Sequence, residues 1–228
     1  NQLKRETSSI ATTRQYLILP SANPFNNKIS DDFIDVKLLQ SLCKYQGRDY
    51  KATDQTLKAI GQKMGSNVLQ PTNFWLEHLP FHYYHKELER YWQVAGSFKQ
   101  YTWGKLFLPQ HKDKKVFFNV GIHLKNKELF FGLDCLRAGT SKLSTEQILM
   151  FDHYVKDQNV MMTIPLDELG DMTWDKLIKM SSDFLIELES KYMEIIDYIW
   201  YNQIDIDNIH HQLIRVKPDI HFFSKKGI

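Results

Sequence analysis

Residues 116–135, VFFNVGIHLKNKELFFGLDC, decide the fold of this chain. In their first half, large apolar residues occupy every second position: Val116, Phe118, Val120 and Ile122. The residues between them are mixed in character, and this period of two is typical of a strand with one covered face. A short turn, Lys125-Asn126-Lys127, leads into a second apolar run. We therefore expect two antiparallel strands, over 115–124 and 128–135, joined as a hairpin.

The flanking sequence adds further elements on both sides of this hairpin. Runs rich in β-branched and aromatic residues predict strands over 14–19, 91–95, 100–108 and 160–164. Apolar residues at helical spacing predict helices over 31–45, 54–64, 145–155 and 173–201. Ser30, Thr53 and Ser144 are in position to cap the first three helices, and Gly65 is in position to end the second. Residues 71–90 fit neither pattern.

These elements predict an α+β fold in which helices pack on a curved antiparallel sheet over residues 90–165. The longest predicted helix, 173–201 near the C-terminus, is amphipathic, with acidic residues largely opposite its apolar stripe. Two organisations remain open. One has a helical N-terminal portion over 1–70 and an α+β DNA-recognition portion over 71–228, and the other has a single domain.

The composition excludes several classes of protein. The chain has 228 residues, of which 43% are hydrophobic and 25% charged, so it can bury a core and does not read as disordered. No stretch approaches the ~20 apolar residues that span a bilayer, and residues 1–9 lack the apolar segment of a signal peptide. Two cysteines do not make a disulfide framework. We therefore expect a cytoplasmic protein without a membrane partner.

The net charge of +2 conceals an uneven distribution. Residues 99–127 hold seven lysines and one aspartate, whereas 128–171 and 172–207 each hold 3 basic and 8 acidic residues. A local excess of positive charge attracts an anionic partner even when the whole chain is almost neutral. The alternative is that these lysines form a solvated edge that keeps the sheet from aggregating.

Aromatic residues lie among the lysines of this segment. Rings such as Tyr101 and Trp103 stack on bases in proteins that bind nucleic acid, and lysines neutralise phosphates and release condensed counterions. Ordinary core packing of the same rings is the alternative. The combination favours double-stranded DNA as the partner, with these candidate binding residues: Tyr84, Tyr101, Trp103, Lys105, Lys114, Lys115, Lys125 and Lys127.

Common motifs for catalysis are missing from the sequence. There is no P-loop, dinucleotide-binding, nucleophile-elbow or zinc-protease motif, so we predict no catalytic residue, metal ligand or cofactor. One alternative is a metal-dependent nuclease, whose nearest candidates are Asp134, at a strand end, and the pair His82 and His85. Another is a protein-interaction module that uses the acidic helix face over 183–197.

The residues that decide the fold also resemble a known family. Residues 102–107 (TWGKLF), the Lys-rich turn after them and residues 116–135 are similar to the N-terminal DNA-recognition domain of McrBC-type modification-dependent restriction GTPases. In that family a strand with a Trp precedes a hairpin of similar texture, and a long helix ending in aromatics closes the domain. The resemblance implies recognition of a methylated cytosine flipped from the duplex into an aromatic-walled pocket. Because no GTPase motif is present, it also implies an isolated recognition module.

We therefore predict a DNA-binding recognition module of a restriction or antiviral defence system, specific for a modified base or a sequence. The five lysines named above would hold the DNA backbone, while Tyr101 and Trp103 would stack on bases or line a pocket. Phosphate contacts would supply affinity and the pocket would supply discrimination. The expected partner, besides DNA, is a GTPase or a nuclease, either separate or fused.

Overall fold

The computed structural model describes residues 34–49, 53–89 and 98–201. The strands predicted over 14–19 and 91–95 and the predicted cap at Ser30 lie outside these ranges. Among the described residues, no helix combines the length and the apolar character needed to cross a membrane.

A five-stranded antiparallel sheet forms the centre of the molecule, with its strands side by side in chain order. The strands are β1 (His85–Leu88), β2 (Gly104–Phe107), β3 (Val116–His123), β4 (Glu128–Cys135) and β5 (Met161–Pro165). The predicted hairpin is its core, because β3 and β4 pair over all their residues, from Val116 with Cys135 to His123 with Glu128. The predicted α+β fold with an antiparallel sheet is confirmed.

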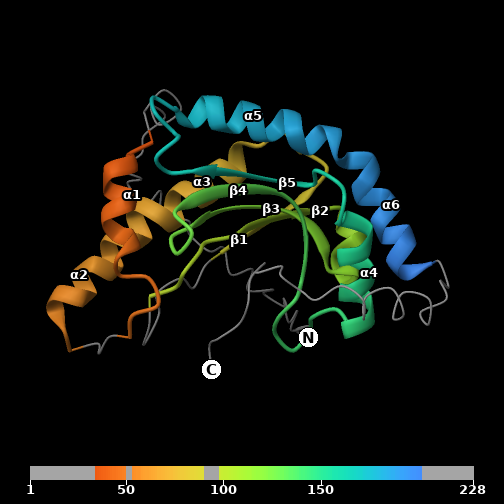
Figure 1. Ribbon diagram of the computed structural model, residues 1–228, viewed down its shortest axis with the longest axis horizontal. Helices are drawn as coiled ribbons and strands as arrows, with labels where there is room; N and C mark the ends of the chain where they lie inside the picture. Colours follow the sequence, from red (N-terminus) through yellow and green to blue (C-terminus); the bar gives the residue numbers. More distant parts are fainter. Residues whose placement is uncertain (1–33, 50–52, 90–97, 202–228) are drawn as a thin grey trace, which may run out of the picture.

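The helices cover one face of this sheet. In Figure 1, α5 (Trp174–Glu187) and α6 (Glu189–Trp200) form an arched run over the curved sheet, and α3 (Gln70–His78) runs beside it. Figure 1 also shows α1 (Val36–Cys43) and α2 (Gln55–Met64) at one end of the sheet and α4 (Thr145–Val155) at the other.

The covered side of the sheet, termed here the helix face, carries the apolar residues that the alternation predicted. Phe131 of β4 packs edge to face on Trp75 of α3 and on Phe184 of α5, with ring centroids 5.8 and 5.6 Å apart. The indole Nε1–H of Trp75 donates to Ser181 Oγ at 2.8 Å and so fastens α3 to α5. Buried side chains of α1 and α2, such as Leu39 and Met64, belong to the same core cluster.

The opposite side of the sheet, termed the second face, carries the mixed residues. On β3 and β4 these are Phe117, Asn119, Gly121, His123, Phe130, Gly132 and Asp134. The strand register places Glu87, Lys105 and Asn119 in one row across β1, β2 and β3. Every residue of β3 is buried, on both faces, so the second face is not a simple solvent-exposed surface.

The structure corrects the predicted ends of the first two helices. α1 begins at Val36 rather than at residue 31, because Asp35 is its N-cap and accepts a hydrogen bond from the Leu38 N–H at 2.9 Å. Asp54, not Thr53, caps α2, and it accepts from the Leu57 N–H at 3.0 Å.

Gly65 does not end the second helix. Its backbone stays in the right-handed helical region, and the chain continues through a single π turn, Gly65–Leu69, directly into α3. The unassigned residues 71–90 therefore contain most of α3 and the whole of β1.

The two C-terminal helical predictions had different outcomes. The helix over 145–155 has the predicted bounds, with the capping box in which Ser144 and Gln147 bond each other's backbone N–H groups. The predicted helix over 173–201 is divided in two, because Leu188, with φ −90° and ψ −2°, interrupts the regular backbone between α5 and α6.

Substitution of Gly121 tests the close packing of β3. A Cβ atom there would collide with the carbonyl oxygen of Thr102 and the ring of Phe130. We expect Gly121→Ala to lower the free energy of unfolding by about 1–3 kcal/mol, the usual cost of overpacking. Gly65→Ala is the control, because a Cβ there meets nothing within 4 Å and alanine favours a helix. Urea denaturation measures both, and equal effects would contradict the packing described.

Candidate functional site

An exposed tyrosine lies where two distant segments meet. The carbonyl of Gln100 accepts the backbone N–H groups of Leu124 and Lys125 at 2.7 and 3.3 Å, which brings the residues before β2 beside the end of β3. The ring of Tyr101 consequently stacks on His123, with centroids 5.6 Å apart and planes inclined by 28°. Tyr101 is 41% exposed, whereas His123 is buried. We call Lys99, Tyr101, His123 and Lys125 the Tyr101 platform.

His123 supports this platform as a neutral ring. Its Nδ1 accepts the backbone N–H of Asn126 at 3.1 Å, which leaves the ring proton on Nε2 in the neutral form. Burial, together with the positive charge of Lys125, lowers the pKa of His123 to about 4. The imidazole therefore carries no charge at neutral pH.

The ammonium groups of the platform differ in their surroundings. Lys125 is exposed. Lys99, whose side chain is 49% exposed, forms an ion pair of 3.2 Å with Glu89, which is buried. Glu89 also accepts the backbone N–H of Trp103 at 3.2 Å. Burial raises the pKa of Glu89, and Lys99 opposes that shift. The charge of Lys99 is thus partly neutralised by a carboxylate of the protein itself.

Lys105 lies on the second face and is largely covered, since its side chain is 15% exposed. Its ammonium lies 4.0 Å from the ring centroid of Trp103 and 4.9 Å from that of Phe117. Glu87 Oε1 is 3.9 Å away. Burial lowers the pKa of Lys105, and the carboxylates of Glu87 and Asp134 counteract part of that shift.

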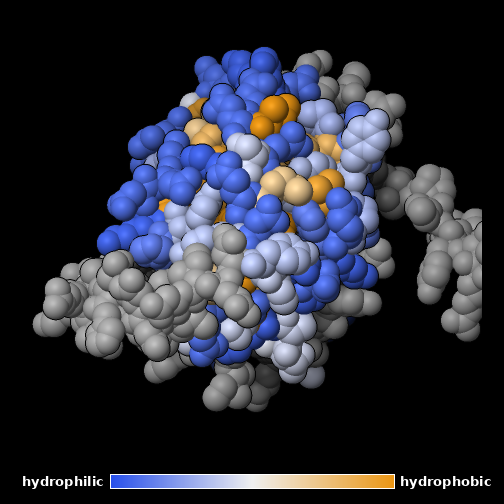
Figure 2. Space-filling model, turned by 90° about the vertical axis from the view of Figure 1, so that its right-hand side faces the viewer, coloured by the Kyte–Doolittle hydropathy of each residue, from blue (hydrophilic) through white to orange (hydrophobic). Residues whose placement is uncertain are grey.

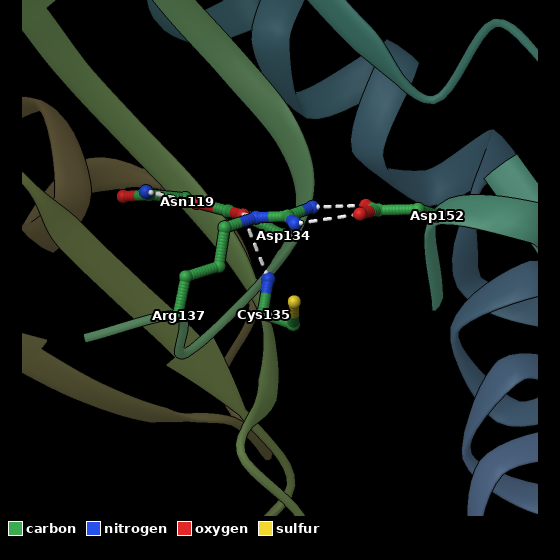
Figure 3. Close-up of polar contacts among 5 residues, drawn as sticks. All are labelled: Asn119, Asp134, Cys135, Arg137 and Asp152. Atoms are coloured by element: carbon green, nitrogen blue, oxygen red, sulfur yellow. Dashed lines mark hydrogen bonds and ion pairs between the residues drawn. The ribbon is translucent and has the colours of Figure 1, made fainter. Parts of the chain in front are cut away.

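A chain of polar contacts runs from β3 to α4 next to Lys105 (Figure 3). Asn119 Nδ2 donates to Asp134 Oδ2 at 3.0 Å, and the Cys135 N–H donates to Asp134 Oδ1 at 2.7 Å. Arg137 Nε lies 3.8 Å from Asp134 Oδ1. Its two terminal nitrogens bind both oxygens of Asp152 at 2.6 and 3.1 Å. Arg137 therefore links the end of β4 to α4.

Asp134 lies in surroundings that disfavour its charged form. Its side chain is 18% exposed, and burial raises its pKa, whereas Arg137, Asn119 and the Cys135 N–H favour the charged form. A buried carboxylate that keeps its charge needs such partners. Arg137 is the cation that supplies the largest opposing effect.

The predicted lysines that precede β3 do not form one surface with the platform. Lys114 lies over the rings of Trp200 and Tyr201 at the end of α6. Lys115, in the left-handed region with φ 59°, precedes β3, whereas Lys125 and Lys127 follow it. The eight residues of β3, a strand ~23 Å long, separate these pairs.

Tyr84 lies apart from all of them. Its ring packs against Phe118 and Tyr192, with centroids 5.9 and 6.0 Å apart, on the helix face. Burial raises its pKa, and Glu189 adds to that shift. The structure thus brings together Tyr101 and Lys125, and separately Trp103 and Lys105, but not Tyr84.

The described ranges contain no group of three or more His, Cys, Asp or Glu side chains arranged to hold a metal. Asp134 is surrounded by hydrogen-bond donors rather than by other carboxylates. The ring of His85 lies 5.0 Å from that of Phe107, tilted by 47°, and His82 is exposed.

The acidic helix face predicted over 183–197 is exposed on α5 and α6. It includes Asp183, Glu187, Glu194 and Asp197, with the apolar Ile186 and Met193 between them. Figure 2 views the end of the molecule that carries α4 and α6, where hydrophilic residues dominate and the hydrophobic groups are small and separate.

Sequence reasoning missed several residues of the site: Glu89, Asn119, His123, Arg137 and Asp152. Alternation along residues 116–123 indicated that Asn119 and His123 share a face, and this was the only signal for either of them. The contact of Arg137 with Asp152 joins a loop to a helix 15 residues later, and no motif marks such a pair.

Removal of Arg137 tests whether it stabilises the Asp134 carboxylate. We expect Arg137→Met to lower the free energy of unfolding by about 1–3 kcal/mol at pH 7, because a buried charge loses its cation. The folded-state pKa of Asp134 is raised. Protonation therefore relieves the buried charge, and the cost of the substitution should shrink as the pH falls through that pKa.

Lys179→Met provides the matched control, because Lys179 pairs with Asp183 and both side chains are exposed. Its effect should stay below about 0.5 kcal/mol. Urea denaturation at pH 7 and at about pH 5 measures both variants. A cost for Arg137→Met that is independent of pH would contradict the role of Asp134.

No protein-family model, no curated protein and no solved structure matches this chain. The resemblance of residues 102–135 to the recognition domain of McrBC-type restriction GTPases therefore stays a prediction from the sequence alone. Any function has to be inferred from the geometry of the Tyr101 platform and the second face.

Proposed function

We propose that this chain is a DNA-binding recognition module and that the Tyr101 platform contacts the DNA. The observation that carries the proposal is an exposed ring fixed on a buried, neutral imidazole, with Lys99 and Lys125 on the adjoining backbone. An aromatic ring that is already held in place loses little conformational freedom when a base or sugar stacks on it.

The charge distribution supports this choice of partner. Lys125 is exposed, and it belongs to the segment 99–127 with its seven lysines and one aspartate. Contacts between ammonium groups and phosphates supply most of the sequence-independent affinity of DNA-binding proteins. Lys99 contributes less in this proposal, because Glu89 already pairs with it.

Lys114 and Lys115, at the far end of β3, would contact a second group of phosphates. They are separated from Lys125 and Lys127 by β3, which is ~23 Å long, a length that corresponds to about seven nucleotides of one DNA strand. Lys114 and Lys115 are half-buried, so they would add fewer contacts than Lys125.

Recognition of a modified or specific site is the finer part of the proposal. The resemblance to the restriction GTPases supports a role in restriction or antiviral defence, with a GTPase or nuclease as partner. In this arrangement Trp103 and Lys105 belong to the discriminating pocket rather than to the phosphate contacts, because Lys105 is largely covered. Tyr84 has no part in it, since its ring packs in the core.

Reversal of one charge tests the phosphate contact. Lys125→Glu should weaken binding to a duplex about tenfold at low salt and reduce the slope of log K against log salt by about one. Lys179→Glu is the control, because it makes the same charge change on exposed α5. Fluorescence anisotropy across a salt series measures both. Equal losses would show that only the net charge matters and would contradict the platform.

Removal of the ring tests stacking separately from charge. Tyr101→Ala should weaken duplex binding by about 1–3 kcal/mol, the range measured for base stacking, without changing the salt dependence. Tyr83→Ala is the control, because Tyr83 is the most exposed aromatic residue described, at 88%. An unchanged affinity of Tyr101→Ala for the duplex would show that the Tyr101 ring does not contact the DNA. Cleavage of the duplex in the presence of Mg²⁺ would favour a nuclease instead.

A further inference from the structure

Two complementary polar groups on the second face have no hydrogen-bond partner among the residues that the structure describes. Asn119 Oδ1 is buried and accepts no hydrogen bond in the described part of the chain, and the whole residue is only 6% exposed. Opposite it, the Lys105 ammonium finds no acceptor at hydrogen-bond distance within those residues. Its nearest carboxylate oxygen, on Glu87, is 3.9 Å away, and its other contacts are ring faces.

The two groups are close enough to be bridged by one small molecule. Lys105 and Asn119 are register partners on neighbouring strands, which places their Cβ atoms ~5 Å apart. The amide nitrogen of Asn119 donates to Asp134, so its oxygen points away from that carboxylate, as Figure 3 shows. A buried acceptor such as Asn119 Oδ1 loses its hydrogen bonds to water and is destabilising when it is left unpaired.

The local charges are balanced, and this limits the kind of ligand. Three carboxylates, those of Glu87, Asp134 and Glu89, act on Lys105, and Lys115 acts on it with the opposite sign. Arg137 lies beside Asp134, and Lys99 pairs with Glu89. A cationic ligand would be repelled by Lys105 and Arg137, and an anionic ligand would be repelled by the carboxylates. A neutral ligand with a hydrogen-bond donor next to an acceptor matches the site.

We propose that this site binds a neutral planar ligand with a cis-amide edge, in which a carbonyl group adjoins an N–H group. The carbonyl accepts from Lys105, the N–H donates to Asn119 Oδ1, and the plane of the ligand lies against Trp103. Lys105 opens the site by moving off the indole ring, because two ring contacts and one long ion pair hold its side chain among the described residues. Such contacts are weaker than the new hydrogen bonds together.

Uracil is the probe, because it is small, neutral and planar and carries this edge. 1,3-Dimethyluracil is the matched control ligand, since it keeps the ring and the carbonyls but has no N–H donor. Saturation-transfer NMR on the wild-type chain should detect uracil at millimolar concentration and show at least tenfold weaker binding of 1,3-dimethyluracil. Equal binding of the two, or binding of neither, would overturn the proposal without reliance on any variant.

Two variants test whether uracil binds at Asn119 and Lys105. Asn119→Leu removes the acceptor and Lys105→Met removes the donor, and each should weaken uracil binding about tenfold, the effect of one hydrogen bond to a buried group. Lys125→Glu should leave uracil binding unchanged, because Lys125 lies on the platform. Retention of full uracil affinity in both Asn119→Leu and Lys105→Met would overturn the assignment of the site.

The source of the ligand and the DNA proposal are tested in separate arms. Thymine bases carry the same edge, so a single-stranded oligothymidylate that competes with uracil would identify a nucleic-acid source, and its failure to compete would identify a free small molecule. The inference rests on the proposed function in that it places the ligand in the pocket of Trp103 and Lys105. Asn119→Leu should nevertheless keep the sequence-independent affinity for duplex DNA, because the lysines of the platform supply that affinity. Loss of duplex affinity in Lys125→Glu with uracil binding intact, and loss of uracil binding in Asn119→Leu with duplex affinity intact, would show that either proposal can fail without the other.

Discussion

The register between β3 and β4 determines which side chains meet in this molecule. Both strands are buried along almost their whole length, so a slip by one residue would exchange the apolar and the polar sets between the two faces. Such a slip would place Asn119 and Asp134 in the hydrophobic core and Phe118 among the polar residues of the second face. The cost of either change fixes the register, and the register in turn aligns Glu87, Lys105 and Asn119.

The second face would be more stable with apolar residues if stability were its only requirement. Replacement of a buried ion pair by well-packed hydrophobic residues is often neutral or favourable. Here, however, Asp134, Glu89 and Lys105 are charged residues in covered positions. The Oδ1 atom of Asn119 has no hydrogen-bond partner in the described ranges. Departures of this kind from the ordinary rules of packing concentrate at functional sites. This face is therefore where a ligand should be sought.

Local signals in the sequence were sufficient to predict the elements that depend on local interactions. The capping box at Ser144 gave the bounds of α4, and the turn at 125–127 gave the bounds of β4. Gly65 was a wrong stop signal, because glycine adopts the right-handed helical region as well as the left-handed one and the chain turns there without leaving the helix. The break at Leu188 carries no Gly or Pro and had no signal in the sequence.

The candidate site was predicted only in part, for a physical reason. A lysine-rich segment reads as one patch along the chain, but the extended backbone of β3 carries Lys115 and Lys125 to opposite ends of the sheet. Contacts such as Asn119 with Asp134 arise from the pairing of two strands, and that of Arg137 with Asp152 from the docking of a helix. These contacts depend on tertiary packing, which periodicity and composition do not encode.

The order of the strands also bears on how the chain reaches its folded state. Each strand pairs with its neighbours in the sequence, and the longest connection between paired strands, residues 136–160, contains α4. The sheet can therefore grow outward from the central hairpin at a modest entropic cost of loop closure. The bond between Trp75 and Ser181, which are 106 residues apart, joins segments from opposite sides of that hairpin. Docking of α5 onto α3 thus closes a longer loop than any of the strand pairings, and it carries the larger entropic cost of loop closure.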